Sequence, residues 1–284
     1  MGWALRGMLA ATVTGLVSIA SAGGSLVNGA RPSNYVHFTF DDGADGSTWK
    51  VAQLLANARI PDTFFVAVDK VRKLTKDEAD TLFAAISSDP EHVGLFLSEP
   101  PARARRSAEA ELEDLVALGS RAITLYRRDP SVSNESRRAL ARRGITEVTW
   151  SIATADLATS DPGAWSTEVV ERIARHNGGV VRVRSTTMNQ PALIAALVTA
   201  LGAENCKRWR AGTPMILAAP IDFFVREAGK ARAVTDHAKA TVAAYRDAVE
   251  RSCEVQLTDH PEQVRKPFKI PQECLDNPLA RGCS

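Results

Sequence analysis

The sequence predicts an α/β protein built on a parallel sheet. Beyond residue 35, apolar runs of strand length alternate with segments whose apolar residues have helical spacing. Several of the candidate strands are bounded by proline or glycine, as at 63–68 and 147–152. The 284 residues, 45% apolar and 24% charged, suffice for a substantial core. A barrel and a doubly wound sheet both satisfy this pattern.

The expected elements follow one another as strand and helix. We expect strands at 36–40, 63–68, 92–97, 122–126, 147–152 and 179–183, and helices at 51–58, 76–86, 107–118, 134–143 and 166–176. From about residue 205 the pattern changes to a cysteine with basic residues, an apolar run at 215–225, a helical stretch at 230–252 and a proline-rich tail. We therefore predict one domain over 35–204 and an extension over 205–284.

The N-terminal residues 1–22 have the pattern of a secretory signal peptide. One basic residue, Arg6, precedes a short apolar stretch, and Ala20-Ser21-Ala22 forms an A-x-A cleavage site. The stretch is shorter than the ~20 apolar residues that a membrane span needs. We expect a secreted, extracellular protein without membrane contact after cleavage. In a eukaryotic secretory route, Asn134 in its N-x-S sequon would be a glycosylation site.

Charge and cysteines narrow the class further. The formal charge of +2, from 35 basic and 33 acidic residues, gives no broad attraction to nucleic acid. In an exported protein we expect the four cysteines to form two disulfides that staple the C-terminal extension, with three possible pairings. No C-x-x-C motif accompanies them, which argues against a zinc site. The cysteines are Cys206, Cys253, Cys274 and Cys283.

Asp41 and Asp42 stand at the end of the first expected strand. In parallel α/β architectures the carboxyl ends of the strands carry the chemistry. Two adjacent carboxylates repel each other unless they share a cation, so the pair indicates either a metal ion or a nearby guanidinium. An Asp-Asp-Gly turn without catalytic meaning is the alternative.

The wider context resembles a known family. Residues 39–43 read TFDDG, and after a helical segment residues 62–66 read DTFFV. This pairing resembles the opening of the polysaccharide deacetylases, the NodB-type fold of carbohydrate esterase family four, over residues 35–202. The resemblance implies a deformed (β/α) barrel that binds N-acetylated polysaccharide. It also implies that Asp41 is the general base and that Asp42 holds a divalent metal, whose bound water attacks the N-acetyl carbonyl.

The second motif of the family has lost its metal ligands. Where H-[ST]-x-x-H is expected, residues 92–100 read HVGLFLSEP, so both metal histidines are missing. His92 precedes them and is typical of a structural histidine. Glu99 stands where the second histidine would be and is able to ligate. Asp42 and Glu99 without imidazole would hold Ca²⁺ or Mg²⁺ better than Zn²⁺.

The third motif, R-x-P-[FY], survives in part at residues 128–131, which read RDPS. The resemblance implies that Arg128 orients the base. It also places Pro130 and Ser131 at the substrate, where the Ser131 N–H would contribute to an oxyanion hole without an aromatic wall. An ordinary turn containing proline is the alternative.

The fourth and fifth motifs are also altered. Asp156 is kept, while Ala153 and Leu157 replace the first aspartate and the tryptophan of D-x-x-D-W. Arg184 stands where the acid histidine would be, and a guanidinium does not release its proton near neutral pH. We expect Arg128 and Arg184 to neutralise the two aspartates in place of the metal, with Arg184 directed at them.

Together these motifs predict a secreted polysaccharide-deacetylase-like protein of N-acetylglucosamine polymers, of the chitin or peptidoglycan type. We expect it to be catalytically impaired, to bind glycan and to carry no cofactor. A divergent active deacetylase, which would use a divalent metal at Asp42 and Glu99, is one alternative. A structural secreted protein without a glycan role is the other.

Overall fold

The computed structural model describes most of the chain between residues 26 and 259. The described residues are 26–27, 34–45, 47–86, 93–98, 107–119, 122–154, 157, 161–184, 190–227, 230–231 and 233–259. Several predictions fall outside them: the signal peptide at 1–22, Glu99, Asp156, Cys274 and Cys283.

The core of the described part of the chain is a parallel sheet of nine strands. Its order is β1-β6-β5-β4-β3-β2-β8-β7, and β9 also pairs with β2. The strands are β1 (Leu26–Val27), β2 (Tyr35–Gly43), β3 (Asp62–Val66), β4 (Val93–Leu97), β5 (Leu125–Arg128), β6 (Thr146–Val148), β7 (Ile152–Ala153), β8 (Gly178–Arg184) and β9 (Leu217–Ala218). The sheet curls into a half-barrel, which confirms the predicted class of a deformed (β/α) barrel. A separate antiparallel pair joins β10 (Arg226–Glu227) to β11 (Lys230–Ala231).

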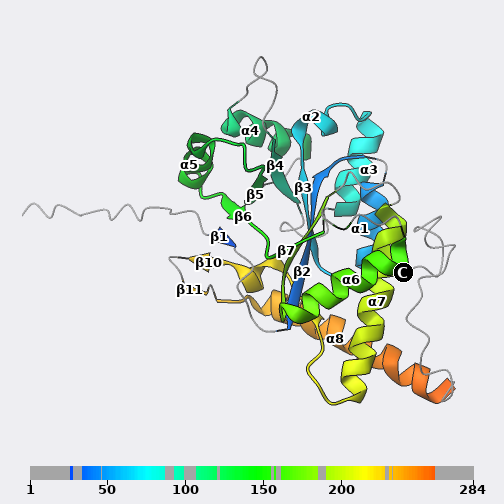
Figure 1. Cartoon of the computed structure of the whole chain (residues 1–284). Coiled ribbons are helices and arrows are strands. Elements are labelled where there is room, and N and C mark those ends of the chain that lie inside the picture. Colours follow the sequence, from blue (N-terminus) through cyan, green and yellow to red (C-terminus); the bar gives the residue numbers. More distant parts are fainter. Residues whose placement is uncertain are drawn as a thin grey trace, which may run out of the picture.

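Helices surround this sheet, with α6, α7 and α8 gathered on one side and α4 and α5 on another (Figure 1). They are α1 (Thr48–Asn57), α2 (Val68–Val71), α3 (Lys76–Ile86), α4 (Ala108–Gly119), α5 (Asn134–Arg142), α6 (Pro162–Arg175), α7 (Gln190–Arg210) and α8 (Asp236–Asp259), with a 3₁₀ turn at Ile221–Phe224. Side-chain caps fix two of their starts: Ser133 accepts from the Ser136 N–H, and Asp161 accepts from the Gly163 N–H just after Pro162. None of the described helices has an apolar stretch long enough to cross a membrane.

The central strand β2 carries the candidate site at its carboxyl end. Six of its consecutive residues, 36–41, are buried, as expected for a parallel strand that is covered on both faces. Its neighbour β8 starts at Gly178, where a β-carbon would lie 2.0 Å from the Tyr35 carbonyl oxygen and φ is +92°. This close approach sets the register that places Arg182 opposite Thr39 and Arg184 opposite Asp41.

One expected strand is two short strands in the structure. The segment predicted at 147–152 forms β6, which pairs with β5, and β7, which pairs with β8 on the far side of β2. Between β6 and β7 the chain crosses from the β5 side of the sheet to the β8 side, and the Ser151 N–H donates to the Val180 carbonyl. This crossing places Trp150 between the two edges, against the interior of the half-barrel.

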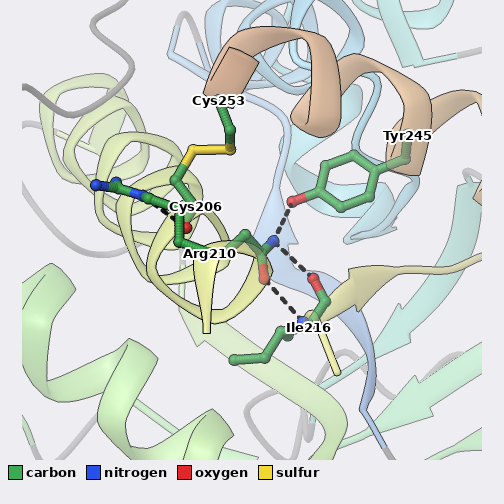
Figure 2. Close-up of a disulfide and its surroundings, with 6 residues drawn as sticks. Cys206, Arg210, Ile216, Tyr245 and Cys253 are labelled. Atoms are coloured by element: carbon green, nitrogen blue, oxygen red, sulfur yellow. Dashed lines mark hydrogen bonds between the residues drawn. A yellow bond between two sulfur atoms is a disulfide. The ribbon is translucent and has the colours of Figure 1, made fainter. Parts of the chain in front are cut away.

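The C-terminal part packs directly on the sheet. The boundary predicted at residue 205 falls inside α7, and β9 pairs with the first two residues of β2. A disulfide between Cys206 and Cys253 joins α7 to α8 (Figure 2). Beside it, the Asn205 amide donates to the Ile216 carbonyl (2.8 Å) and to the Tyr245 hydroxyl (3.3 Å), and accepts from the Ile216 N–H (2.7 Å).

Candidate functional site

The carboxylate of Asp41 lies inside the half-barrel between two arginines. Asp41 is fully buried near the end of β2. The Nη1 of Arg127, from β5, lies 2.6 Å from one carboxylate oxygen. The Nε of Arg182, from the adjacent β8, donates to the other oxygen. Each oxygen of Asp41 therefore accepts a charge-assisted hydrogen bond from a different strand.

Arg127 is built into the interior. Its guanidinium is fully buried and also donates to the Thr39 hydroxyl (2.7 Å) and to the backbone carbonyls of Val148 (3.0 Å) and Thr149 (3.3 Å). The guanidinium carbon lies 4.5 Å from the centre of the Phe65 ring. Burial lowers the pKa of Arg127, while the negative charge of Asp41 opposes that shift.

Arg182 completes the cluster from the other side. Its guanidinium carbon lies 4.0 Å from the centre of the Trp150 ring, and that of Arg127 lies 5.4 Å from the same ring. The Nη2 of Arg182 is buried and has no hydrogen-bond partner among the residues that the structure describes. We call Asp41, Arg127, Arg182 and Trp150 the interior cluster.

Asp42 lies in a different environment from its neighbour. It has a left-handed backbone (φ +61°) at an irregularity in the β2–β3 pairing, and its side chain is 29% exposed. The Nζ of Lys70 lies 2.9 Å from its carboxylate and donates to its backbone carbonyl at 2.9 Å. The irregular backbone thus separates the two adjacent carboxylates, one inside the half-barrel and one at its rim.

The sequence prediction chose the wrong arginine on β5. Arg128 pairs with Glu147 (2.8 Å) and donates to the Val132 carbonyl (3.0 Å), so it does not orient Asp41. Arg127 makes that contact instead. Adjacent residues of a strand face opposite sides, so an error of one position exchanges the interior for the exterior.

The prediction for β8 also needs a correction, this time along one face of the strand. Arg184 is 45% exposed, and its Nη2 lies 3.6 Å from the Asp129 carboxylate. Arg182 shares its face of the strand and reaches Asp41 first, so Arg184 is not the cation that neutralises Asp41. An arginine inside the valine-rich run of β8 was a signal in the sequence that pointed to Arg182.

The predicted substrate residues Pro130 and Ser131 form a turn on the surface. The Asp129 carboxylate accepts from the Ser131 N–H (3.3 Å) and from its hydroxyl (3.1 Å). The N–H that was expected in an oxyanion hole is therefore engaged within the turn.

Comparison with known proteins agrees with this architecture. The polysaccharide deacetylase family model matches residues 28–111, which include both aspartates. The chain has the fold of the polysaccharide deacetylases. The resemblance seen in the sequence is thereby confirmed.

Two solved structures with this deacetylase fold are similar to the chain. The peptidoglycan deacetylase Bd3279 of Bdellovibrio bacteriovorus superposes with a TM-score of 0.51 at 17% identity, over 68% of this chain and 54% of that protein. The chain thus spans about half the length of that relative. The peptidoglycan N-acetylglucosamine deacetylase Bc1960 superposes with a TM-score of 0.50 at 18% identity, over 66% of this chain and 88% of that protein. No curated protein sequence matches the chain.

Deacetylases with this fold typically depend on a divalent metal, which needs several donor side chains close together at the strand ends. Within the described ranges, no three His, Cys, Asp or Glu side chains gather closely enough to hold an ion. The second-motif segment on β4 presents buried Leu95, Phe96 and Leu97. Three cationic side chains, those of Arg127, Arg182 and Lys70, contact the two aspartates instead. The described residues therefore do not fit a divalent cation, which these positive charges would repel.

Proposed function

We propose that the chain is a secreted, polysaccharide-deacetylase-like protein that binds an N-acetylglucosamine polymer without hydrolysing it. The observation that carries this proposal is the state of Asp41. A general base must lie within hydrogen-bond reach of the proton that it removes. Asp41 is fully buried, and a guanidinium occupies each of its oxygens.

The surroundings of Asp41 support the loss of hydrolysis. Proton uptake at Asp41 would leave two buried guanidiniums without a counter-charge, which is unfavourable in a low-dielectric interior. Arg184 offers no proton to a leaving amine because a guanidinium stays protonated near neutral pH. The geometry of Asp41 is that of a structural carboxylate, which ties β2 to β5 and β8, and less that of a base that transfers protons.

Other observations support the polymer and the compartment. The fold and the family match point to N-acetylated polysaccharide, and the two structural neighbours are deacetylases of peptidoglycan. The Cys206–Cys253 disulfide and the signal-like pattern at 1–22 support export to an oxidising compartment.

The test combines a reaction and a binding assay on the full secreted chain. Acetate release from chitin oligomers and from peptidoglycan is measured with added Zn²⁺, Co²⁺ or Mg²⁺, alongside co-sedimentation with the insoluble polymers. We expect sedimentation without acetate release, and no stoichiometric zinc by elemental analysis. Acetate release that is abolished by chelation and by Asp42→Ala would establish a divergent active deacetylase. Absence of both binding and release would leave a structural role.

A further inference from the structure

The interior cluster has one positive charge too many. It holds two guanidiniums, and in the described part of the chain Asp41 is the carboxylate paired with both. The nearby acids are engaged elsewhere: Glu147 pairs with Arg128 and Arg137, and Asp129 pairs with Arg184. Burial of a charge without a counter-charge is unfavourable, so the cluster favours the arrival of one negative charge.

The cluster also contains a buried hydrogen-bond donor whose acceptor is missing from the described residues. Within the described ranges, the buried Nη2 of Arg182 has no acceptor, although the Nε of the same guanidinium donates to Asp41. Buried donors are nearly always satisfied in folded proteins. A water molecule would accept a hydrogen bond from this donor but would leave the excess positive charge in place. An anion would accept the hydrogen bond and also neutralise the charge.

We propose that the interior cluster is a binding subsite for a carboxylate, with Arg182 as the residue that contacts it. The planar fork of a guanidinium matches the two oxygens of a carboxylate. The charge count also selects a monoanion, because a dianion would turn an excess of +1 into −1. The Trp150 ring packs on Arg182 and strengthens the pairing by excluding water from one face.

Two sources provide this chemistry. One is a small free carboxylate such as acetate. The other is a carboxylate carried by the polymer, as peptidoglycan carries acids and chitin does not. The second source rests on the proposed glycan binding, while the subsite itself does not. Arg182 is 8% exposed and lies on the same strand as the half-exposed Arg184, so the approach is from the strand ends.

The first experiment uses acetate alone. Sodium acetate replaces sodium chloride at constant ionic strength, and the side-chain Nε–Hε resonances of the arginines are followed by NMR together with the midpoint of thermal unfolding. We expect saturable shifts at Arg182 and Arg127 and a midpoint increase of about 2–4 °C, because a ligand that binds only the folded state stabilises it.

Two matched variants locate the site. Arg182→Met removes the Nη2 donor but leaves Asp41 paired with Arg127. We expect this variant to lose the response to acetate. Arg184→Met removes the same charge from the same strand at an exposed position, and we expect it to keep the response. Absence of saturable shifts in the unaltered protein, or an equal loss in both variants, would overturn the carboxylate subsite.

The second experiment separates the two sources. Co-sedimentation is compared on native peptidoglycan and on peptidoglycan whose carboxyl groups have been amidated. At least a fivefold weaker retention on the amidated polymer, reproduced by Arg182→Met on native polymer, would assign the carboxylate to the glycan. Equal retention with a positive acetate response would assign it to a free acid. A positive acetate response without any glycan retention would refute the proposed function and leave the subsite standing.

Discussion

The two ends of β2 carry buried polar groups of opposite character. At its start, β9 packs beside the neutral network of Asn205, Ile216 and Tyr245, in which donors and acceptors meet within 3.3 Å. At its end, the interior cluster buries three charges, and the Nη2 of Arg182 has no hydrogen-bond partner in the described part of the chain. The donors and acceptors of the first network are paired with one another, as expected of a structural element. The second network leaves a donor and a positive charge unmatched, as expected of a site that binds a ligand.

This difference implies different responses to substitution. Loss of a member of the complete network leaves neutral groups unsatisfied, and the effect is confined to hydrogen bonding and packing. In the interior cluster the outcome depends on which charge is removed. Removal of the single anion increases the imbalance, whereas removal of one cation corrects it.

The largest effect is expected for Asp41→Asn. Two buried guanidiniums would then face a neutral amide, and we expect the free energy of unfolding to fall by about 3–5 kcal/mol. Urea unfolding followed by circular dichroism measures the loss. Arg182→Met should change the same quantity by no more than about 1 kcal/mol, because Asp41 and Arg127 remain as a neutral pair.

The double variant of Asp41→Asn with Arg182→Met sharpens this expectation. It should be more stable than Asp41→Asn alone, since one of the two uncompensated cations is gone. A mild effect of Asp41→Asn, or a double variant that loses the sum of both single effects, would contradict the excess of positive charge.

At the other end of β2, removal of the disulfide is expected to have the next largest effect. The bond joins residues separated by 47 positions, and loss of such a cross-link lowers the free energy of unfolding by about 2–4 kcal/mol. The variant with Cys206→Ala and Cys253→Ala should show this loss in urea. It should still respond to acetate as the unaltered protein does, because the disulfide does not contact the interior cluster.

Thiol chemistry provides the control for that experiment. With Cys206 and Cys253 paired, Cys274 and Cys283 are the remaining two cysteines of the chain. The denatured, unreduced protein should therefore show no reactive thiol, and the double variant should show none either. Reactive thiol in the unaltered protein would mean that the second predicted disulfide is not formed.

The neutral network should also have its own dependence on pH. Burial raises the pKa of Tyr245 well above its ordinary value, although the hydrogen bond from Asn205 opposes the shift. Because the folded-state pKa is raised, the stability from neutral Tyr245 is present below about pH 10 and is lost as the pH rises further. Tyr245→Phe should lower stability by about 1 kcal/mol at pH 7. Urea unfolding between pH 7 and 11 should show a shallower alkaline decline in this variant than in the unaltered protein.

The smallest effect is expected for Arg184→Ala. Its ion pair with Asp129 joins side chains that are 45% and 32% exposed, and such pairs contribute about 0–1 kcal/mol. If Arg184 faced the two aspartates, as the sequence analysis expected, its removal would leave a buried carboxylate uncompensated and destabilise the protein strongly. If Arg184→Ala lowered the free energy of unfolding by more than about 2 kcal/mol in urea, Arg184 would have to be a buried ion-pair partner like Arg182.

The sequence by itself determined the alternating α/β architecture, the strand-end position of Asp41 and Asp42, and the likeness to the polysaccharide deacetylases. These features are local, since they rest on the spacing of apolar residues and on short motifs such as TFDDG. The cysteine count likewise predicted disulfides, and the structure selects Cys206–Cys253 from the three possible pairings.

Only the tertiary structure decided which cations meet Asp41. The two contacts join residues 86 and 141 positions apart, and their partners follow from the register of β5 and β8 against the sheet. On β5 the sequence offered Arg127 beside Arg128, which lie on opposite faces of the strand, whereas Arg182 and Arg184 of β8 share one face and differ in their position along the strand. Strand pairing settles both cases, because a shift of one residue along a strand exchanges its two faces, and a shift of two moves the side chain along the same face.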